Sequence, residues 1–420
     1  MRDVIVVGAG AAGVGAGLAL LRQGKDFLIL EAKDRGGGRA HSDSQSLGRI
    51  WDHGCHWFHS ASINPLRNLA LKLDHPFVDA PRPYGEWLWR DGAFADPHHY
   101  EADLQSLAER MTAQSRASGD TALATLLDVS SPWHAAIRHD MALTYSQEPE
   151  DISVADGNAF NDTGENTPVA GGYGNLVARL ARLLPIRLSL PVTAVTVTAN
   201  AVRLATAEGE LEARQVIVAV PQRVLERGLI KFSPRLPQDI TEAIENLPMG
   251  WFEKAGFAFD APVFGDKEDS GVEILARIAG EDWPTPVQIS PGLKPIAICH
   301  IAGHRARDLA ADERIALCEE ALVQCFGSGI GKHVTRRATS AWASDPYIGG
   351  AYSCARPGMS GVRRRFHDAV HERIQFAGEH TSTDAMATAH GAFLSGHAAA
   401  MRALGLPHDA AEPLWLPGDA

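Results

Sequence analysis

A glycine-rich run at residues 8–13, Gly-Ala-Gly-Ala-Ala-Gly, constrains the fold of this chain more than any other feature. It follows the β-branched, apolar stretch Asp3–Val7, which is typical of a buried parallel strand, and it opens a helix-like stretch. Gly8 permits the tight turn, Gly10 lets the backbone approach a pyrophosphate, and Gly13 lets the helix pack closely on the strand. The N-terminus of that helix would then face the phosphate anions.

The next strand-like segment, Asp26–Leu30, ends at Glu31, roughly twenty residues beyond the glycines, which is the spacing of a dinucleotide-binding unit. A carboxylate at this position accepts hydrogen bonds from ribose hydroxyls and disfavours the 2′-phosphate of NADP. The two features together predict a Rossmann-like α/β domain, a doubly wound parallel sheet that binds a dinucleotide. The alternative is a glycine-rich turn without a ligand.

The rest of the chain predicts a second domain inserted into the first. Strand-like stretches return at residues 186–221 and near 374–377, and the segments between them mix helical patterns with other strands. We expect a discontinuous dinucleotide-binding domain made of residues 1–75, 166–240 and 336–420. We expect an inserted α+β substrate-binding domain made of residues 76–165 and 241–335.

The net charge and the cysteine content indicate which partners and which cellular compartment are expected. The 420 residues carry 39 Lys and Arg against 51 Asp and Glu, a net charge of −12, which disfavours nucleic acid as a partner. Five scattered cysteines form neither a disulfide framework nor a zinc spacing and favour a reducing compartment. The uncharged stretch Val4–Leu21 is long enough for a membrane span, but its glycines and its strand-then-helix pattern argue against a span or a signal peptide. We therefore expect a cytoplasmic protein with no membrane or nucleic-acid partner and no metal site.

Three further motifs carry a family resemblance. Residues 31–39 read Glu-Ala-Lys-Asp-Arg-Gly-Gly-Gly-Arg, residues 374–381 read Ile-Gln-Phe-Ala-Gly-Glu-His-Thr, and residues 387–396 read Ala-Thr-Ala-His-Gly-Ala-Phe-Leu-Ser-Gly. With the glycine turn they resemble the flavin-containing amine oxidase family, and the last two motifs are nearest to its polyamine-oxidase and lysine-specific demethylase branches. The resemblance spans nearly the whole chain and is weak at about 80–165 and 262–295. It implies FAD as the cofactor and disfavours a nicotinamide dehydrogenase.

The resemblance implies cofactor contacts along the chain. In the family the acid of the Ala-Gly-Glu motif, here Glu379, meets the flavin ribitol, and the backbone at the position of Val192 contacts adenine. The helix that begins near Ala389 would point its N-terminus at the flavin pyrimidine and stabilise negative charge on the reduced ring. The implied cofactor-binding residues are Gly8, Gly10, Ala11, Ala12, Gly13, Glu31, Ala32, Arg39, Gly54, Cys55, His56, Trp57, Val192, Trp342, Gly378, Glu379, Ala387, Thr388 and Ala389.

Four residues are implied to act at the catalytic centre, namely Lys254, His59, Tyr352 and Thr388. In the family the lysine holds a water near flavin N5 and assists the reaction with oxygen; the alternative here is a surface lysine on a strand. His59 would hydrogen-bond the substrate or tune the protonation of the amine, because imidazole titrates near neutral pH. His56 and Trp57, in the same stretch, have the alternative roles of a polar loop residue and a packing residue.

Two positions depart from the monoamine-oxidase pattern. Ala351 stands where those enzymes attach FAD through a cysteine, so we expect FAD to be bound non-covalently. Tyr352 fits one of the two tyrosines that frame the substrate amine, but Thr388 occupies the second position. The resemblance to the polyamine-oxidase branch is therefore stronger.

The resemblance implies an FAD-dependent amine oxidase. It would oxidise a C–N bond of a primary or secondary amine to an imine by hydride transfer to the flavin, and O2 would reoxidise the flavin to give H2O2. The expected partners are a small amine and O2, and the oligomeric state stays open between monomer and homodimer. Three alternatives remain: an L-amino-acid oxidase that holds the carboxylate with Arg82 or Arg90, a desaturase or porphyrinogen-oxidase-like flavoprotein, and a non-catalytic FAD-binding module.

Overall fold

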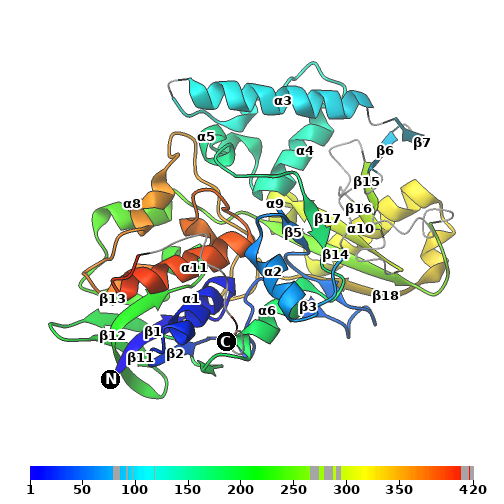
Figure 1. Ribbon diagram of the computed structural model, residues 1–420. Helices are drawn as coiled ribbons and strands as arrows, with labels where there is room; N and C mark the ends of the chain where they lie inside the picture. The colour runs from blue at the N-terminus through cyan, green and yellow to red at the C-terminus, as the bar shows by residue number, and fades with distance from the viewer. Residues whose placement is uncertain are drawn as a thin grey trace.

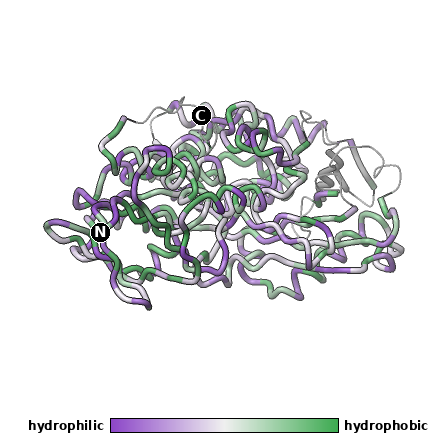
Figure 2. The backbone as a smooth tube through the Cα atoms, turned by 60° about the horizontal axis from the view of Figure 1, so that its bottom comes forward, coloured by the Kyte–Doolittle hydropathy of each residue, from purple (hydrophilic) through white to green (hydrophobic). Residues whose placement is uncertain are grey.

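The computed structural model describes residues 1–78, 86–90, 93–96, 98–117, 119–264, 274–278, 287–289, 295–407 and 416. Two sheets dominate these residues, and a layer of helices, among them α3 (His98–Arg116) and α4 (His134–Tyr145), lies along one side of the molecule (Figure 1). Hydrophobic stretches run through the body of the molecule, and hydrophilic stretches alternate with them in the outer loops (Figure 2).

The larger sheet has eight strands within the described residues. Seven lie in the order β13-β10-β11-β12-β1-β2-β9, and β19 pairs with β12. Its strands are β1 (Arg2–Val7), β2 (Phe27–Leu30), β9 (Ile186–Arg187), β10 (Ala194–Val197), β11 (Val202–Thr206), β12 (Gly209–Val218), β13 (Lys231–Ser233) and β19 (Ile374–Phe376).

The register of the parallel strands defines the edge where a ligand would bind. Val7, at the end of β1, lies opposite Leu30 of β2 and Val218 of β12, and Val218 in turn lies opposite Phe376 of β19. The carboxyl ends of four parallel strands therefore meet at one edge, where sheets of this kind bind their ligands. The glycine turn, Glu31 and the 377–379 motif follow these strand ends directly.

Both faces of this sheet are covered, which accounts for its continuous apolar strands. Alternate residues of β1 point to opposite sides: Val4 and Val6 pack with helices α1 (Ala11–Arg22) and α11 (Ala389–Ala403), and Ile5 and Val7 join the core on the other face. That second core also contains residues of α7 (Gln222–Glu226), α8 (Gln238–Glu245) and the helical turn η6 (Val362–Phe366). The predicted doubly wound α/β fold is confirmed.

Helices α1 and α11 pack closely because small residues line their contact. A Cβ on Gly15 would lie 2.1 Å from the carbonyl oxygen of Phe393, and a Cβ on Gly396 would lie 1.8 Å from that of Ala12. Side chains at these two positions would push the helices apart. The uncharged N-terminal stretch is thus a strand and a buried helix. Among the described residues, no helix combines the length and the hydrophobicity that crossing a bilayer requires.

The second sheet has seven strands in the described part of the chain, in the order β18-β14-β17-β16-β15-β6-β7. Its strands are β6 (Glu86–Arg90), β7 (Ala93–Ala95), β14 (Phe252–Phe259), β15 (Ile274–Ile278), β16 (Val287–Ile289), β17 (Ile296–Ala302) and β18 (Val334–Thr339). One face of it packs on α10 (Ala311–Phe326) through an apolar core that includes Ala255, Phe257 and Cys299.

The other face of the second sheet is chemically different. Phe252, Lys254 and His300 share that face, because residues two apart on a strand point the same way and His300 lies opposite Lys254 in the register. Gln288 of β16 pairs with Ile298 and lies on the same face. This is the face of the sheet from which polar side chains reach the segment that contains Asp52 and His56.

Smaller elements connect the two sheets. They are β3 (Ser42–Asp43), β4 (Trp51–Asp52), β5 (Trp57–His59), β8 (Asn166–Pro168), α2 (Pro65–Lys72), α5 (Val154–Gly157), α6 (Tyr173–Ala181), α9 (Gly303–Asp308), η1 (Leu123–Leu126), η2 (Pro149–Asp151), η5 (Ile330–His333) and η7 (Glu379–Thr381). Strand β18 spans the expected domain limit between residues 335 and 336, and the domain limits themselves stay a prediction.

Candidate active site

At two positions of the glycine turn, Gly8 and Gly13, the backbone excludes a side chain, and at the third, Gly10, the backbone faces open space. Gly8 has a φ of +104°, and a Cβ on Gly13 would lie 1.9 Å from the carbonyl oxygen of Gly8, so neither position accepts a side chain. A Cβ on Gly10 would meet no atom within 4 Å. Gly10 is also the N-cap of α1, and no side chain caps the helix there. An uncapped helix N-terminus in front of open space is a site for an anion, and Ala11 and Ala12 begin the helix at this point.

Glu31 sits at the end of β2 beside this turn. Its carboxylate accepts hydrogen bonds from the backbone N–H groups of Ala9, at 2.7 Å, and Lys33, at 2.9 Å. Burial raises the pKa of this carboxyl, and the two N–H donors oppose that rise. The backbone N–H of Leu190 donates to the carbonyl of Glu31 at 2.8 Å, which brings the segment before Val192 to the same place. Glu31 thus contacts the glycine turn through Ala9, and Ala32 and Val192 lie one residue after Glu31 and two residues after Leu190.

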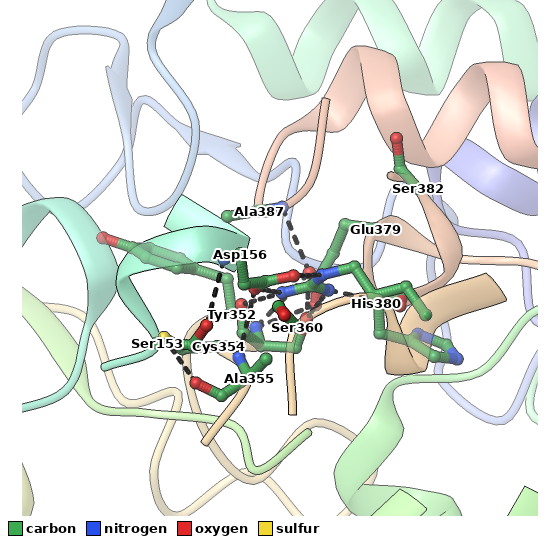
Figure 3. A network of polar contacts seen from close by, with 12 residues as sticks. Ser153, Asp156, Tyr352, Cys354, Ala355, Ser360, Glu379, His380, Ser382 and Ala387 are labelled. Atoms are coloured by element: carbon green, nitrogen blue, oxygen red, sulfur yellow. Dashed lines mark hydrogen bonds and ion pairs between the residues drawn. The ribbon is translucent and has the colours of Figure 1, made fainter. Parts of the chain in front are cut away.

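Glu379, after β19, is the centre of a buried polar cluster (Figure 3). Its carboxylate accepts from Arg39 Nη1 at 3.0 Å, from Ser353 Oγ at 2.7 Å and from the backbone N–H of Ala387 at 3.3 Å. Burial alone would raise the pKa of Glu379, but the positive charges of Arg39 and Arg363 help to outweigh it and lower the pKa. The carboxylate is therefore held ionised. Arg39 also donates to the carbonyl of Ala351, so the segments around residues 39, 351 and 379 meet here.

Helix α11 begins beside this cluster with a side-chain cap. Thr388 is its N-cap: the Oγ1 accepts from the N–H of Gly391 at 3.0 Å and donates to the carbonyl of Ala385 at 2.7 Å. Ala387, just before it, has a φ of +62°, which is unusual for a residue with a side chain. The hydroxyl of Thr388 thus has a structural partner on each side, and its catalytic role stays a prediction, as does the cofactor role of Ala389.

Lys254 lies in the interior and not on the surface. It is 4% exposed, and its Nζ donates to the carbonyl oxygens of Gly54, at 2.6 Å, and Asp52, at 3.2 Å. The alternative reading of a surface lysine on a strand is therefore wrong. A buried ammonium is unfavourable unless it donates hydrogen bonds or faces negative charge, and two carbonyl oxygens meet the first condition.

A buried contact between a histidine and an aspartate lies next to Lys254. Nδ1 of His56 is 3.0 Å from Oδ2 of Asp52, and a small cavity lined by both side chains also borders Lys254 and Gln288. Burial would raise the pKa of Asp52, but His56, the hydroxyl of Ser42 and Lys254 outweigh it and lower the pKa. His56 is therefore a buried residue of the loop before β5 that contacts Asp52, and its cofactor role stays a prediction.

The turn at residues 53–57 is fixed from several sides. A Cβ on Gly54 would lie 2.0 Å from the carbonyl oxygen of Arg39, and the Nε1 of the buried Trp342 donates to the carbonyl of His53 at 3.0 Å. Burial raises the pKa of the Cys55 thiol, which keeps it protonated. The implied cofactor residues Arg39, Gly54 and Trp342 are thus brought together, although they are far apart in the sequence.

A chain of aromatic rings extends from this turn. Trp57 and His300 have ring centroids 6.1 Å apart, His300 and Phe252 5.5 Å, and Phe252 and Tyr352 6.2 Å. The Tyr352 hydroxyl donates to the carbonyl of Leu143. We did not predict Phe252 or His300 from the sequence. The signal was present, because Phe252 is two residues before Lys254 and His300 lies opposite Lys254 on the neighbouring strand.

His59 lies at the other end of this group of rings. Its ring centroid is 6.0 Å from that of Trp57, and its Nδ1 contacts Oδ1 of Asn166. The contact arises because β5 and β8 are antiparallel and place His59 opposite Asn166. Asn166 is a third residue that we did not predict from the sequence. In the described part of the chain, no three His, Cys, Asp or Glu side chains come together in a way that would hold a metal ion.

The fold and these contacts are typical of a dinucleotide-binding protein whose sheet edge is faced by polar and aromatic side chains of a second sheet. Residues 11–404 match the family model described as flavin containing amine oxidoreductase, so the chain belongs to that family. It is an FAD-dependent oxidoreductase that acts on amines. The residues present fit FAD: the open space at Gly10, the uncapped helix behind it, and the carboxylates of Glu31 and Glu379 each offer what the dinucleotide requires.

Three known proteins illustrate the similarity. Polyamine oxidase 4 of Oryza sativa subsp. japonica is 29% identical, over 95% of this chain and 88% of that protein. Human lysine-specific histone demethylase 2 is 26% identical over 94% of this chain, which spans only 52% of the demethylase. The structure of cyclohexylamine oxidase from Brevibacterium oxydans IH-35A superposes with a TM-score of 0.83 at 19% identity, over 96% of this chain and 99% of that one. This last similarity confirms the two-part fold.

Proposed function

We propose that this protein oxidises a C–N bond of a primary or secondary amine, either a polyamine or another small amine, to an imine that water then hydrolyses. When bound, FAD would supply the redox chemistry as a two-electron carrier between the α-carbon of the amine, which loses hydride, and O2, which is reduced to H2O2. We further propose that FAD is bound non-covalently, since Ala351 has no nucleophilic side chain to attach it. The names of the relatives, a polyamine oxidase and a cyclohexylamine oxidase, support the choice of an amine.

The observation that carries this proposal is the position of Lys254. Its ammonium donates to the carbonyls of Asp52 and Gly54, in the turn that we propose lies at the flavin. A fixed cation in a site that excludes water stabilises negative charge that develops on oxygen as it is reduced. Both atoms that accept these hydrogen bonds belong to the backbone of that turn.

We propose that the aromatic residues and His59 bind the amine substrate. The rings of Trp57, Phe252 and Tyr352 offer an apolar wall along which the carbon skeleton of an amine would lie. Hydride leaves the α-carbon only when the nitrogen lone pair is free to form the imine, so the amine must be neutral. His59, whose ring is oriented by Asn166, is the group that we propose accepts the proton of the incoming ammonium.

The alternatives have no specific support in the described residues. For the L-amino-acid oxidase, Arg82 lies outside the described residues, and only the backbone of Arg90 is described, in β6. The proposal is tested by measuring the H2O2 and the carbonyl product released from putrescine, spermidine, N-acetylspermine, tyramine, cyclohexylamine and several L-amino acids. The carbonyl product is a ketone from cyclohexylamine, a 2-oxo acid from an amino acid and an aldehyde from the other amines. Equal amounts of H2O2 and carbonyl product from one amine class support the proposal. Turnover of amino acids alone would replace it with the L-amino-acid oxidase.

A further inference from the structure

A fully buried arginine, Arg363, connects the helical turn η6 with the helix α5 close to Glu379. Arg363, on η6, is 1% exposed and makes a bidentate ion pair with Asp156 of α5: its Nε is 2.8 Å from Oδ1, and its Nη2 is 2.8 Å from Oδ2. Asp156 belongs to the segment between β7 and β8, outside the motifs of the dinucleotide site. Figure 3 shows Asp156 and Glu379 within one network of polar contacts.

The network continues from Arg363 to Glu379 through a single hydroxyl. Nη1 of Arg363 donates to Ser353 Oγ at 2.8 Å, and the same Oγ donates to Oε2 of Glu379 at 2.7 Å. The backbone N–H of Ser353 donates to Glu379 as well, at 3.2 Å. Nη1 of Arg363 also donates to the carbonyl of His380 at 3.2 Å. Arg363 thus donates hydrogen bonds to Ser353, which contacts the carboxylate of Glu379, and to His380, which follows Glu379 in the chain.

The charges along this network alternate in sign. Asp156, Arg363, Glu379 and Arg39 follow one another as anion, cation, anion and cation. A hydroxyl that accepts from a guanidinium is a stronger donor to the next acceptor, since hydrogen bonds in a chain polarise one another. Buried ion pairs of this kind add little net stability compared with apolar side chains of similar volume. Their presence beside a cofactor carboxylate calls for another explanation.

We propose that Arg363 and Ser353, braced by Asp156, are positioning residues that fix the carboxylate of Glu379 and keep it ionised to accept hydrogen bonds from the ribityl hydroxyls of FAD. The inference rests on the flavin site and not on the identity of the amine. The charged or titratable groups that face Glu379 are Arg39 from the loop after β2, His380 from η7, Arg363 from η6, and Tyr352 beside Ser353. Of these, Arg363 is the one that reaches Glu379 through a shared hydrogen-bond partner.

The sign of the expected pH effect follows from the charges. The pKa of Glu379 lies below its ordinary value because Arg39, His380 and Arg363 oppose the effect of burial. Protonation of Glu379 removes an acceptor, so the protein should release FAD when the pH falls through that lowered pKa. Loss of the Ser353 hydroxyl removes a donor to the ionised form, which raises the pKa. FAD should then dissociate at a higher pH than in the wild type.

The test compares two serine-to-alanine variants of the full chain. S353A removes the link between Arg363 and Glu379, and S153A is the matched control. Ser153 is equally buried and caps α5: its hydroxyl donates to Asp120 and accepts from the backbone N–H of Asp156. S153A therefore disturbs the helix that carries Asp156 but leaves the carboxylate of Asp156 and the link from Arg363 to Glu379 in place. For both variants, FAD affinity is measured by fluorescence titration of the apoprotein, and the pH midpoint of flavin release is measured without any amine.

S353A should weaken FAD binding about tenfold and raise the pH midpoint of release by about one unit, the effect of one charge-assisted hydrogen bond. S153A should change neither quantity. R363K, which keeps the charge but loses the fork geometry, should lie between S353A and the wild type. If S353A behaves like the wild type, or if S153A shifts both quantities equally, the network is only structural and the proposal is overturned. Because no amine is used, these results do not depend on the proposed reaction.

Discussion

The ammonium of Lys254 donates a 2.6 Å hydrogen bond to the carbonyl oxygen of Gly54, a residue 200 positions earlier in the chain. The contact joins the polar face of the second sheet to the turn beside Arg39 and Trp342. It therefore places one fixed positive charge where the two parts of the molecule meet.

Replacement of Lys254 should separate FAD binding from the reaction with oxygen. In K254M we expect FAD to stay bound and reduction by amine to proceed, but reoxidation of the flavin by O2 should slow about a hundredfold, the usual effect of removing an electrostatic stabiliser. Stopped-flow mixing of the amine-reduced enzyme with air-saturated buffer measures this step. K332M, at an exposed lysine, is the control. Unchanged reoxidation in K254M would remove the lysine from the mechanism.

Substitutions at Gly10 and Gly13 should have different effects: the first should abolish FAD binding and the second should lower the stability of the apoprotein. A side chain on Gly10 would enter open space, so G10L should leave the free energy of unfolding of the apoprotein within about 1 kcal/mol of the wild type and abolish FAD binding. G13A places a Cβ 1.9 Å from the carbonyl oxygen of Gly8 and should lower that free energy by about 2–3 kcal/mol. Urea titration of the apoproteins and FAD titration distinguish the two. FAD binding by G10L would show that this space does not receive the dinucleotide.

The aromatic ring of Tyr352 should contribute more to KM for the amine than its hydroxyl does. That hydroxyl already donates to the carbonyl of Leu143, so Y352F loses a structural hydrogen bond, worth about 1 kcal/mol of stability, and should change KM for the amine less than threefold. Y352A removes the ring that packs against Phe252 and should raise KM at least tenfold. Steady-state kinetics of both variants with one good substrate measure the difference. A large KM increase in Y352F would instead assign the hydroxyl to the substrate.

His380 should make stability depend on pH. Burial lowers the pKa of this fully buried histidine from 6.5 to about 4, against the opposing charge of Glu379. Between those two values the unfolded chain binds a proton that the folded protein does not, so stability falls as the pH drops from 6.5 to 4. The loss amounts to about 3 kcal/mol at most. H380L should flatten the unfolding free energy across this range, and H98L, at an exposed histidine, should not. An equally steep profile in H380L would contradict the assignment.

The dinucleotide-binding part of the site could be predicted from local sequence motifs. Gly8, Gly10, Gly13 and Glu31 belong to one βαβ unit of about thirty residues, so their spacing alone defines their geometry. The C-terminal motif could be recognised for the same reason, since a strand end and a helix start enclose Glu379.

The contacts between distant segments were not predictable in this way. His300 reaches the site only because β17 pairs with β14 in one particular register, and Asn166 only because β8 pairs with β5. Arg363 lies in a short helical turn with three successive arginines, and nothing in that sequence distinguishes the buried one from its neighbours. A one-residue change in strand register would move His300 to the opposite face, and the sequence pattern does not specify register that closely.

The central claim is that a small amine reduces the FAD of this protein and that O2 reoxidises it. The most direct test is to add the amines and L-amino acids one by one to the purified protein without oxygen and to follow the visible flavin spectrum. We predict that one class of amine bleaches the spectrum and that air restores it with release of H2O2. If the protein binds FAD but none of these compounds bleaches its spectrum, it is not an amine oxidase for this range of substrates.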